Sequence, residues 1–556
     1  MEIKNNLIKK RKVFNFSIII LFCFYFLVGI NIYKDYGLST DEPFHRTVGY
    51  YWYIWIINNF FNNFADLESL QNSFNKMEWS KDLLEGTFLE YGVFFDLLAA
   101  FIENLFNLKN FQDIYYARHL LNFFFFFLSS ICFFYLIKYR FKNNYLALVG
   151  VLFYVTSPRI FAESFYNCKD IIFMCLIVFS IFFALKVLKD YKIKNIILFS
   201  FFAALSTGVR SMGIFLIFLL IIFFIFESLE IKNFFKKKIS LVLLSLILYL
   251  VFTYLFWPFL WLDPVNNFFA GLQYFNTLGG VASPFYLGKY VNTGYSPWHY
   301  PFVWIAVSTP IIYSLFFLIA SFKIIFALLK NFLAINPDDY SKKLWKNYNE
   351  KIDFFILLFF LGPIIAVITF QSNLYTGWRH LYFIYPGLIY LAIYAINYLI
   401  NLNANKILKN VFFLIVFLSI ILNISNLIKF HPFQNTYFNY LVEKKANTLF
   451  EVDYWGLGNA FSIEKILNDM DEFDNVSIGV ASFTPLAYSR YIINNKKINN
   501  VIFAGTTKNN QDYFITNYIY ERNPKFLKKY FISKKYEKFF TLKRGNIIIN
   551  EIYKKK

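Results

Sequence analysis

The sequence predicts an α-helical polytopic membrane protein with about eleven transmembrane helices, and three observations carry this prediction. Of the 556 residues, 58% are hydrophobic and 16% are charged, whereas apolar residues make up roughly half of a soluble globular protein. Apolar runs that are long enough to cross a bilayer, or nearly so, recur along the first 430 residues. The Lys and Arg residues behind the net charge of +20 lie mostly in short loops between these runs and in the tail. Membrane topology therefore explains the basic charge better than a nucleic-acid partner does.

The apolar runs supply the predicted spans in chain order. They cover residues 13–32, 117–137, 144–157, 171–188, 195–208, 212–227, 239–257, 301–329, 353–370, 381–400 and 409–428. The first run follows a basic start, as a signal peptide would, but it lacks a clear small-residue cleavage site. We therefore predict a retained first helix.

The orientation follows from the loops. The Lys/Arg-rich segments are the N-terminus and the loops around 138–142, 186–194, 232–238, 342–351 and 406–409. All six fall on the cytoplasmic side if the N-terminus is inside. Residues 33–116, 158–170, 208–213, 258–300, 371–380 and the tail after 429 are then external. We expect an integral protein of a bacterial inner (plasma) membrane with an external, periplasmic C-terminal domain.

The first external loop, residues 33–116, is predicted to carry helices that lie in the membrane interface. The apolar segment 92–106 contains Asp96 and Glu103, which favour an amphipathic surface helix over another span. Residues 50–61 have the same character. These helices would frame a site at the membrane boundary.

The chain changes character near residue 430, so we predict a transmembrane domain at 1–429 and a small external α/β domain at 430–556. A helical stretch at 462–473 precedes short apolar runs at 476–483, 500–506 and 513–520, and Arg544-Gly545-Asn546 is typical of a hairpin turn. No internal repeat, GxGxxG motif or Walker loop occurs, so the sequence gives no support to a nucleotide site.

The most informative polar stretch is Gly37 to Arg46, directly after the first apolar run. Asp41 and Glu42 are adjacent carboxylates, followed by His45 and Arg46, where the chain leaves the bilayer. A carboxylate there can take a proton from a hydroxyl, and a nearby cation can hold an anionic leaving group. The predicted catalytic residues are therefore Asp41 and Glu42.

The alternative interpretation is an ordinary capped loop. Ser39, Thr40 or Asp41 would then be the N-cap of a surface helix that starts near Pro43.

Cations suited to phosphate cluster on or near the predicted external face. Arginine donates two parallel hydrogen bonds to a phosphate, so the donor-phosphate candidates are Arg118, Arg159, Lys169, Arg210 and Arg379. For Arg159, Arg210 and Arg379, the alternative is snorkelling or pairing with Glu163 or Asp170.

His45, Asp170, His299 and His380 are further site candidates. For His299 and His380, a hydrogen-bonded imidazole at the interface is the competing interpretation. No spacing such as HxxxH appears, so no metal site and no cofactor are predicted, although a divalent metal stays open. The four cysteines show neither CxxC nor metal-ligand spacing.

Several motifs together resemble a known family of membrane enzymes. They are Asp41-Glu42 after the first span, Glu90-Tyr91-Gly92, Ala117 to Asn122, Ser157 to Asp170, Pro297 to Tyr300, Gly377 to His380 with Tyr385-Pro386, His431-Pro432 with Tyr437 to Asn439, and Asp453 to Gly456. In this combination the chain resembles the GT-C polytopic glycosyltransferases, specifically family 39, the protein O-mannosyltransferase and aminoarabinose transferase-like group. The likeness spans most of the chain.

The resemblance implies an inverting transfer of a sugar from a polyprenyl-phosphate carrier to a glycan, lipid or protein acceptor on the external side. Asp41 would be the general base, and Glu42 would orient the base or the acceptor. No lumenal MIR-type domain is found, which puts a protein Ser/Thr acceptor in doubt. The partners implied are the lipid-linked donor, the acceptor and membrane lipids, with no nucleic acid. A lipid-linked oligosaccharide flippase or other transporter, or a non-catalytic membrane scaffold, is the alternative.

Overall fold

The computed structural model describes residues 2–61, 66–231, 233–277, 283–292, 296–334, 344–402, 405–471, 474–506, 510–521 and 523–556. Lys342, Lys343 and Phe473, which belong to a predicted basic loop and a predicted helix, lie outside these residues.

Long apolar helices dominate the described chain and confirm the predicted fold class. Eight helices are long and apolar enough to cross a membrane, and the bent pair α7–α8 makes a possible ninth. The eight are α6 (Phe111–Phe141), α9 (Asp170–Asp190), α11 (Phe215–Glu230) with the short helix η1 (Ser211–Ile214) before it, α12 (Phe234–Phe256), α16 (Ile311–Leu333), α17 (Tyr348–Thr369), α18 (Tyr385–Ile400) with η3 (Arg379–Ile384) before it, and α19 (Lys406–Phe430). The apolar part of α1 (Glu2–Ile32) and all of α10 (Ile193–Thr207) are shorter apolar helices. Each of the eleven predicted runs falls on one of these helices, so the chain is an integral membrane protein.

A break between α7 (Asn144–Val155) and α8 (Pro158–Tyr166) places polar groups at the end of the bundle. The two helices are bent by 67°. The break follows from the sequence, because a proline disfavours helical backbone at the residue before it and suits the first helical position. Ser157 is extended accordingly. Helix α9 begins soon afterwards at Asp170, so the ends of α8 and α9 lie close together.

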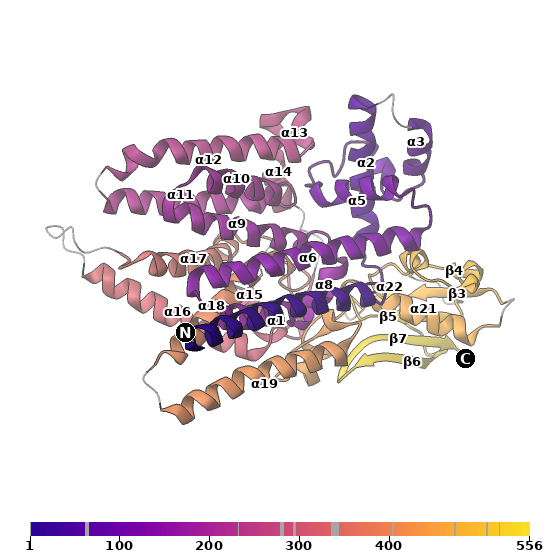
Figure 1. The fold of residues 1–556 in the computed structure, drawn as a ribbon. Helices are drawn as coiled ribbons and strands as arrows, with labels where there is room; N and C mark the ends of the chain where they lie inside the picture. Colours follow the sequence, from indigo (N-terminus) through magenta and orange to yellow (C-terminus); the bar gives the residue numbers. More distant parts are fainter. Residues whose placement is uncertain are drawn as a thin grey trace.

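The first loop folds into helices at one end of the bundle (Figure 1). They are α2 (Glu42–Phe60), α3 (Leu67–Asn75), α4 (Ser80–Leu84) and α5 (Phe94–Leu105). The predicted helices are present, but Asp96 and Glu103 of α5 do not face solvent. Both are buried and form ion pairs with Arg118 and Arg46. The polar side of α5 therefore packs against protein.

The C-terminal region contains a five-stranded sheet in the order β4-β3-β5-β7-β6. The strands are β3 (Val476–Val480), β4 (Val501–Phe503), β5 (Tyr513–Thr516), β6 (Tyr536–Arg544) and β7 (Ile547–Lys555), and α21 (Gly458–Asp469) contacts β7. Strand β3 pairs in parallel with β4 and β5, whereas β7 pairs antiparallel with β5 and β6. The predicted hairpin at Gly545 joins β6 to β7. The small C-terminal sheet region is confirmed.

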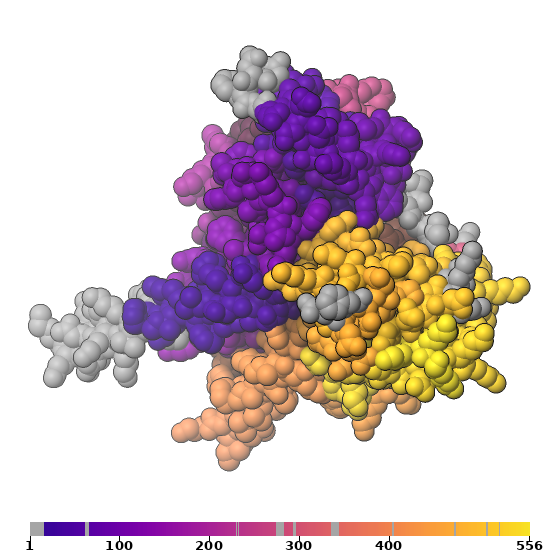
Figure 2. All heavy atoms as spheres, turned by 90° about the vertical axis from the view of Figure 1, so that its right-hand side faces the viewer, coloured from indigo at the N-terminus to yellow at the C-terminus, as the bar shows by residue number. Residues whose placement is uncertain are grey.

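The first-loop helices and the sheet lie at the same end of the long helices (Figure 1). Seen from that end, residues of the first loop and of the C-terminal region touch (Figure 2). The side-chain amide of Gln112 donates to the Ile492 carbonyl at 2.9 Å across this contact.

The remaining short elements lie in two places. Between α12 and α16 the chain forms α13 (Phe259–Leu262), α14 (Pro264–Thr277), β1 (Phe285–Tyr286), β2 (Lys289–Tyr290) and α15 (Tyr300–Ser308). The short helices α20 (Ala446–Leu449) and α22 (Leu527–Tyr530) belong to the tail.

Candidate active site

A cavity of about 630 Å³ opens where the first loop meets the ends of the long helices. Its wall combines charged and apolar side chains from segments far apart in the sequence. The structure brings six predicted site residues to this one wall: Asp41, His45, Lys169, Arg210, Arg379 and His380.

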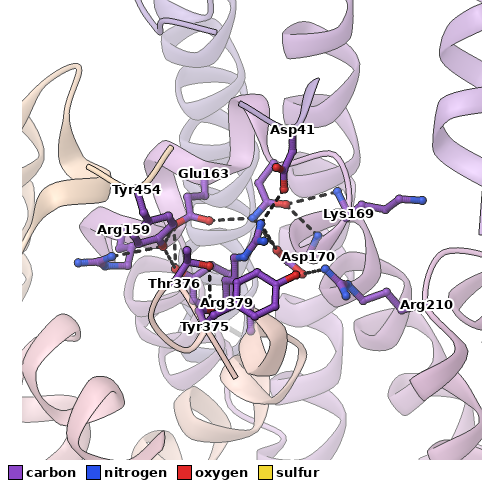
Figure 3. A network of polar contacts seen from close by, with 12 residues as sticks. Asp41, Arg159, Glu163, Lys169, Asp170, Arg210, Tyr375, Thr376, Arg379 and Tyr454 are labelled. Carbon is purple, nitrogen blue, oxygen red and sulfur yellow. Dashed lines mark hydrogen bonds and ion pairs between the residues drawn. The ribbon is translucent and has the colours of Figure 1, made fainter. Parts of the chain in front are cut away.

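Asp41 stands at the N-cap position of α2, but its side chain makes no capping hydrogen bond. Its Oδ2 instead accepts a hydrogen bond from Arg379 Nη1 at 2.8 Å (Figure 3). The Asp41 side chain is 41% exposed, and Arg379 is nearly buried. Asp41 therefore presents its carboxylate to the cavity, and the simple capping interpretation does not describe its side chain.

Glu42 points to different surroundings from its neighbour. Its Oε2 accepts the Ser39 backbone N–H at 2.8 Å, and its Oε1 lies 2.9 Å from His119 Nε2. The side chain is buried and does not line the cavity. Glu42 thus fixes the turn that carries Asp41, and its predicted role in orienting the base stays a prediction.

Asp170 connects the two cavity arginines. One of its oxygens forms an ion pair with Arg210, and the other lies 4.0 Å from Arg379 Nη1 (Figure 3). The Arg210 and Arg379 Nε–H groups have no hydrogen-bond partner among the described residues. Both nitrogens are buried, and the two arginines line the cavity as cations that attract an anion.

Asp96 is the site residue that the sequence interpretation missed. It lies 2.6 Å from Arg118, 3.3 Å from Lys169 and 3.7 Å from His45, measured between its carboxylate oxygens and the nearest side-chain nitrogens. The one available signal was a carboxylate within an apolar helix, which also fits a surface helix. Asp96 does not line the cavity itself, but it holds Lys169 in its position at the cavity wall.

His45 is buried among charged side chains. Burial, together with the charges of Lys169, Arg118, Arg210 and Arg379, lowers the pKa of His45 well below its ordinary 6.5. The imidazole is therefore neutral at pH 7.

His45, Asp96 and Cys168 form the group of potential metal ligands found among the described residues, with ligand atoms within 4.8 Å of one another. The same Asp96 carboxylate already faces Lys169 and Arg118. Two adjacent cations make this place a poor one for a divalent metal ion.

Besides Glu42 and Asp170, which do not line the cavity, three of the predicted residues lie away from it. Arg118 is buried against Asp96, and His299 bonds the Tyr286 hydroxyl at 2.6 Å. Arg159 donates to the Tyr437 carbonyl at 3.1 Å and, more weakly, to the Tyr454 hydroxyl at 3.4 Å. It therefore ties α8 to the C-terminal region.

Glu163 also connects α8 to the C-terminal region. It accepts a hydrogen bond from the Tyr382 hydroxyl at 2.7 Å. It accepts another from the Tyr454 hydroxyl at 3.1 Å (Figure 3). Both contacts are buried, so this network positions the segment from Arg379 onward relative to α8.

Residues 93–257 match the family described as dolichyl-phosphate-mannose-protein mannosyltransferase. This match confirms, over that part of the chain, the resemblance drawn from the motifs. No curated protein matches the sequence.

Two kinds of solved structure are similar. ArnT from Cupriavidus metallidurans bound to undecaprenyl phosphate is 12% identical with a TM-score of 0.45, covering 96% of this chain and 98% of that chain. The oligosaccharyltransferase AglB from Archaeoglobus fulgidus, in complex with an inhibitory peptide and a dolichol-phosphate, is 9% identical with a TM-score of 0.42, covering 77% and 61%.

Proposed function

We propose that the protein is an inverting glycosyltransferase that moves a sugar from a polyprenyl-phosphate carrier to an acceptor hydroxyl at the external membrane face. The observation that carries the proposal is the convergence of Asp41, Lys169, Arg210 and Arg379 on one cavity. A carboxylate beside several cations is what acid–base catalysis with an anionic leaving group requires.

The cavity suits both parts of such a donor. Among the described residues that line it, three cations (Lys169, Arg210 and Arg379) face one carboxylate, Asp41. The excess of positive charge would bind a phosphodiester. Val209, Met212, Ile214, Val367 and Phe370 give the same cavity an apolar side for a prenyl chain.

The matched family supports this donor class, since its description names a dolichyl phosphate, which is a polyprenyl phosphate. The sugar and the acceptor stay open, and a glycan or lipid hydroxyl is the preferred acceptor class.

The proposed reaction is a single displacement. Asp41 takes the proton of the acceptor hydroxyl as its oxygen bonds to the anomeric carbon from the face opposite the phosphate. The bond between that carbon and the phosphate oxygen breaks, and its electron pair stays on the phosphate. Arg210 and Lys169 stabilise the charge that develops there. The leaving group is already activated, so the reaction needs no ATP.

Arg379 has two tasks in this scheme. The first is to hold the Asp41 carboxylate, at 2.8 Å. The second is to help bind the donor phosphate with its positive charge. Asp170 keeps Arg210 and Arg379 together from the other side. The base and the phosphate-binding groups are thereby coupled.

The test is transfer by the purified full chain in liposomes, given polyprenyl phosphate carrying a radiolabelled sugar and acceptor membranes. We expect label to move from the lipid donor to the membranes and free polyprenyl phosphate to appear in equal amount. Movement of intact donor across the bilayer without cleavage would identify a transporter instead and would contradict the proposal.

A further inference from the structure

A second cavity, of about 340 Å³, lies on the opposite side of α2 from the candidate active site. Asp41, Phe44 and His45 face the first cavity, whereas Pro43, Arg46, Thr47 and Tyr50 face the second. Positions three, four and seven apart share one face of a helix, so α2 is the wall between the two cavities.

The second cavity differs chemically from the first. Its buried ion pair, Arg46 with Glu103, is bidentate at 3.0 and 2.5 Å, so the two charges cancel. Lys76, Lys109 and Glu78 are its other charged residues. Positive charge is therefore not concentrated here, and the cavity offers little to bind the phosphate of a donor.

Neutral hydrogen-bonding groups and aromatic rings make up much of the remaining lining. Asn104, Asn107, Ser69 and Ser73 contribute donors and acceptors together. Tyr491 of the C-terminal region packs its ring on Phe111 at 4.6 Å and near Tyr115 at 6.0 Å, and its hydroxyl donates to Glu78 at 3.3 Å. Mixed donors and acceptors beside flat apolar rings match a sugar, whose hydroxyls need both and whose C–H faces pack on rings.

We propose that this cavity binds a carbohydrate part of the acceptor, remote from the hydroxyl that reacts. This inference rests on the proposed function. A ligand that reaches both cavities must pass the width of α2, about 10–12 Å with side chains. The acceptor is therefore a glycan or glycolipid larger than one sugar.

The experiment compares acceptor and donor saturation curves of the purified full chain, with cell membranes depleted of this protein as the acceptor. Ser73→Trp fills the cavity from an exposed position of α3, and Asn72→Trp adds the same ring at an exposed neighbour that does not line it. Tyr491→Ala removes a ring, and Tyr491→Phe keeps it. We expect Ser73→Trp and Tyr491→Ala to raise the acceptor concentration for half-maximal rate about tenfold and to leave the donor value unchanged. Asn72→Trp and Tyr491→Phe should stay near the parent.

The results separate the proposed second site from the proposed function. An unchanged acceptor curve in Ser73→Trp, with transfer intact, would overturn the second site alone. No donor cleavage by the parent chain would overturn both proposals. If proteinase treatment of the membranes abolishes the difference in acceptor concentration between Ser73→Trp and the parent, the site binds peptide, and the carbohydrate assignment is wrong.

Discussion

Arg210 shows how the site is built at the scale of single residues. One end of its guanidinium pairs with Asp170, and its Nε–H has no partner among the described residues. An arginine held by a carboxylate on one side is oriented for an anion on the other, because its donors form a rigid fork. The partner Asp170 thus serves as a support for Arg210.

We expect Arg210→Gln to lower kcat/KM for the lipid-linked donor about tenfold to a hundredfold. A hydrogen bond to a charged group contributes about 1.5–3 kcal/mol, and here that contribution grows as charge develops on the phosphate. The measurement is donor kinetics with the purified chain. Arg490→Gln, an exposed arginine of the tail, is the control. Equal kinetics in Arg210→Gln and the parent would exclude Arg210 from phosphate binding.

At the scale of elements, α2 and α5 are packed so closely that their backbones touch. A Cβ at Gly49 of α2 would overlap the carbonyl and the side chain of Asp96 on α5. This close approach brings His45 next to Asp96, and so fixes Lys169 at the cavity. The geometry of the site therefore depends on a glycine at position 49.

We expect Gly49→Ala to destabilise the protein by about 1–3 kcal/mol although alanine is the better helix former, because the two helices must move apart. Donor cleavage should fall with it. The measurement is the thermal unfolding midpoint in detergent, beside the rate of cleavage. Asn58→Ala, at an exposed position of the same helix, should keep both values. A stabilised, fully active Gly49→Ala would show that the helices do not meet as described.

At the scale of the whole molecule, the C-terminal region closes over the end of the bundle. Glu451 lies at this junction, where its backbone N–H donates to the Phe285 carbonyl at 3.1 Å. Burial raises the pKa of Glu451 to about 7, although the Gly377 backbone N–H and the arginines Arg379 and Arg159 lower it in part. The junction therefore carries a carboxyl group that resists ionisation.

This junction should make stability depend on pH in a defined direction. The pKa of Glu451 is higher in the folded chain than in the unfolded chain, where it is near 4.5, so its contribution to stability is lost as pH rises from about 4.5 to about 7. Glu451→Gln should remove this loss, which amounts to about 3 kcal/mol. Thermal unfolding midpoints at pH 5 and pH 8 are the measurement, with the exposed Glu537→Gln as control. A difference between parent and Glu451→Gln that is the same at both pH values would contradict this account.

Sequence patterns predicted the helical class because hydrophobic length depends on local composition alone. They also singled out Asp41, Lys169, Arg210 and Arg379, which line one cavity, since charged groups beside apolar runs are unusual. They could not assign the direction of a side chain. The contacts of Asp96 with Arg118 and of Arg159 with Tyr454 were not predicted, because these partners are distant in the sequence.

The most direct test of the central claim is single-turnover cleavage of polyprenyl-phosphate sugar by the Asp41→Asn chain in the presence of acceptor. Asp35→Asn is a matched control, because the Asp35 side chain is 46% exposed and pairs with His431 at 2.8 Å, outside the cavity. Loss of a general base should slow transfer about a hundredfold or more in Asp41→Asn and leave Asp35→Asn unchanged. Transfer at the parent rate by a folded Asp41→Asn chain would show that the reaction does not occur where Asp41 and the arginines meet.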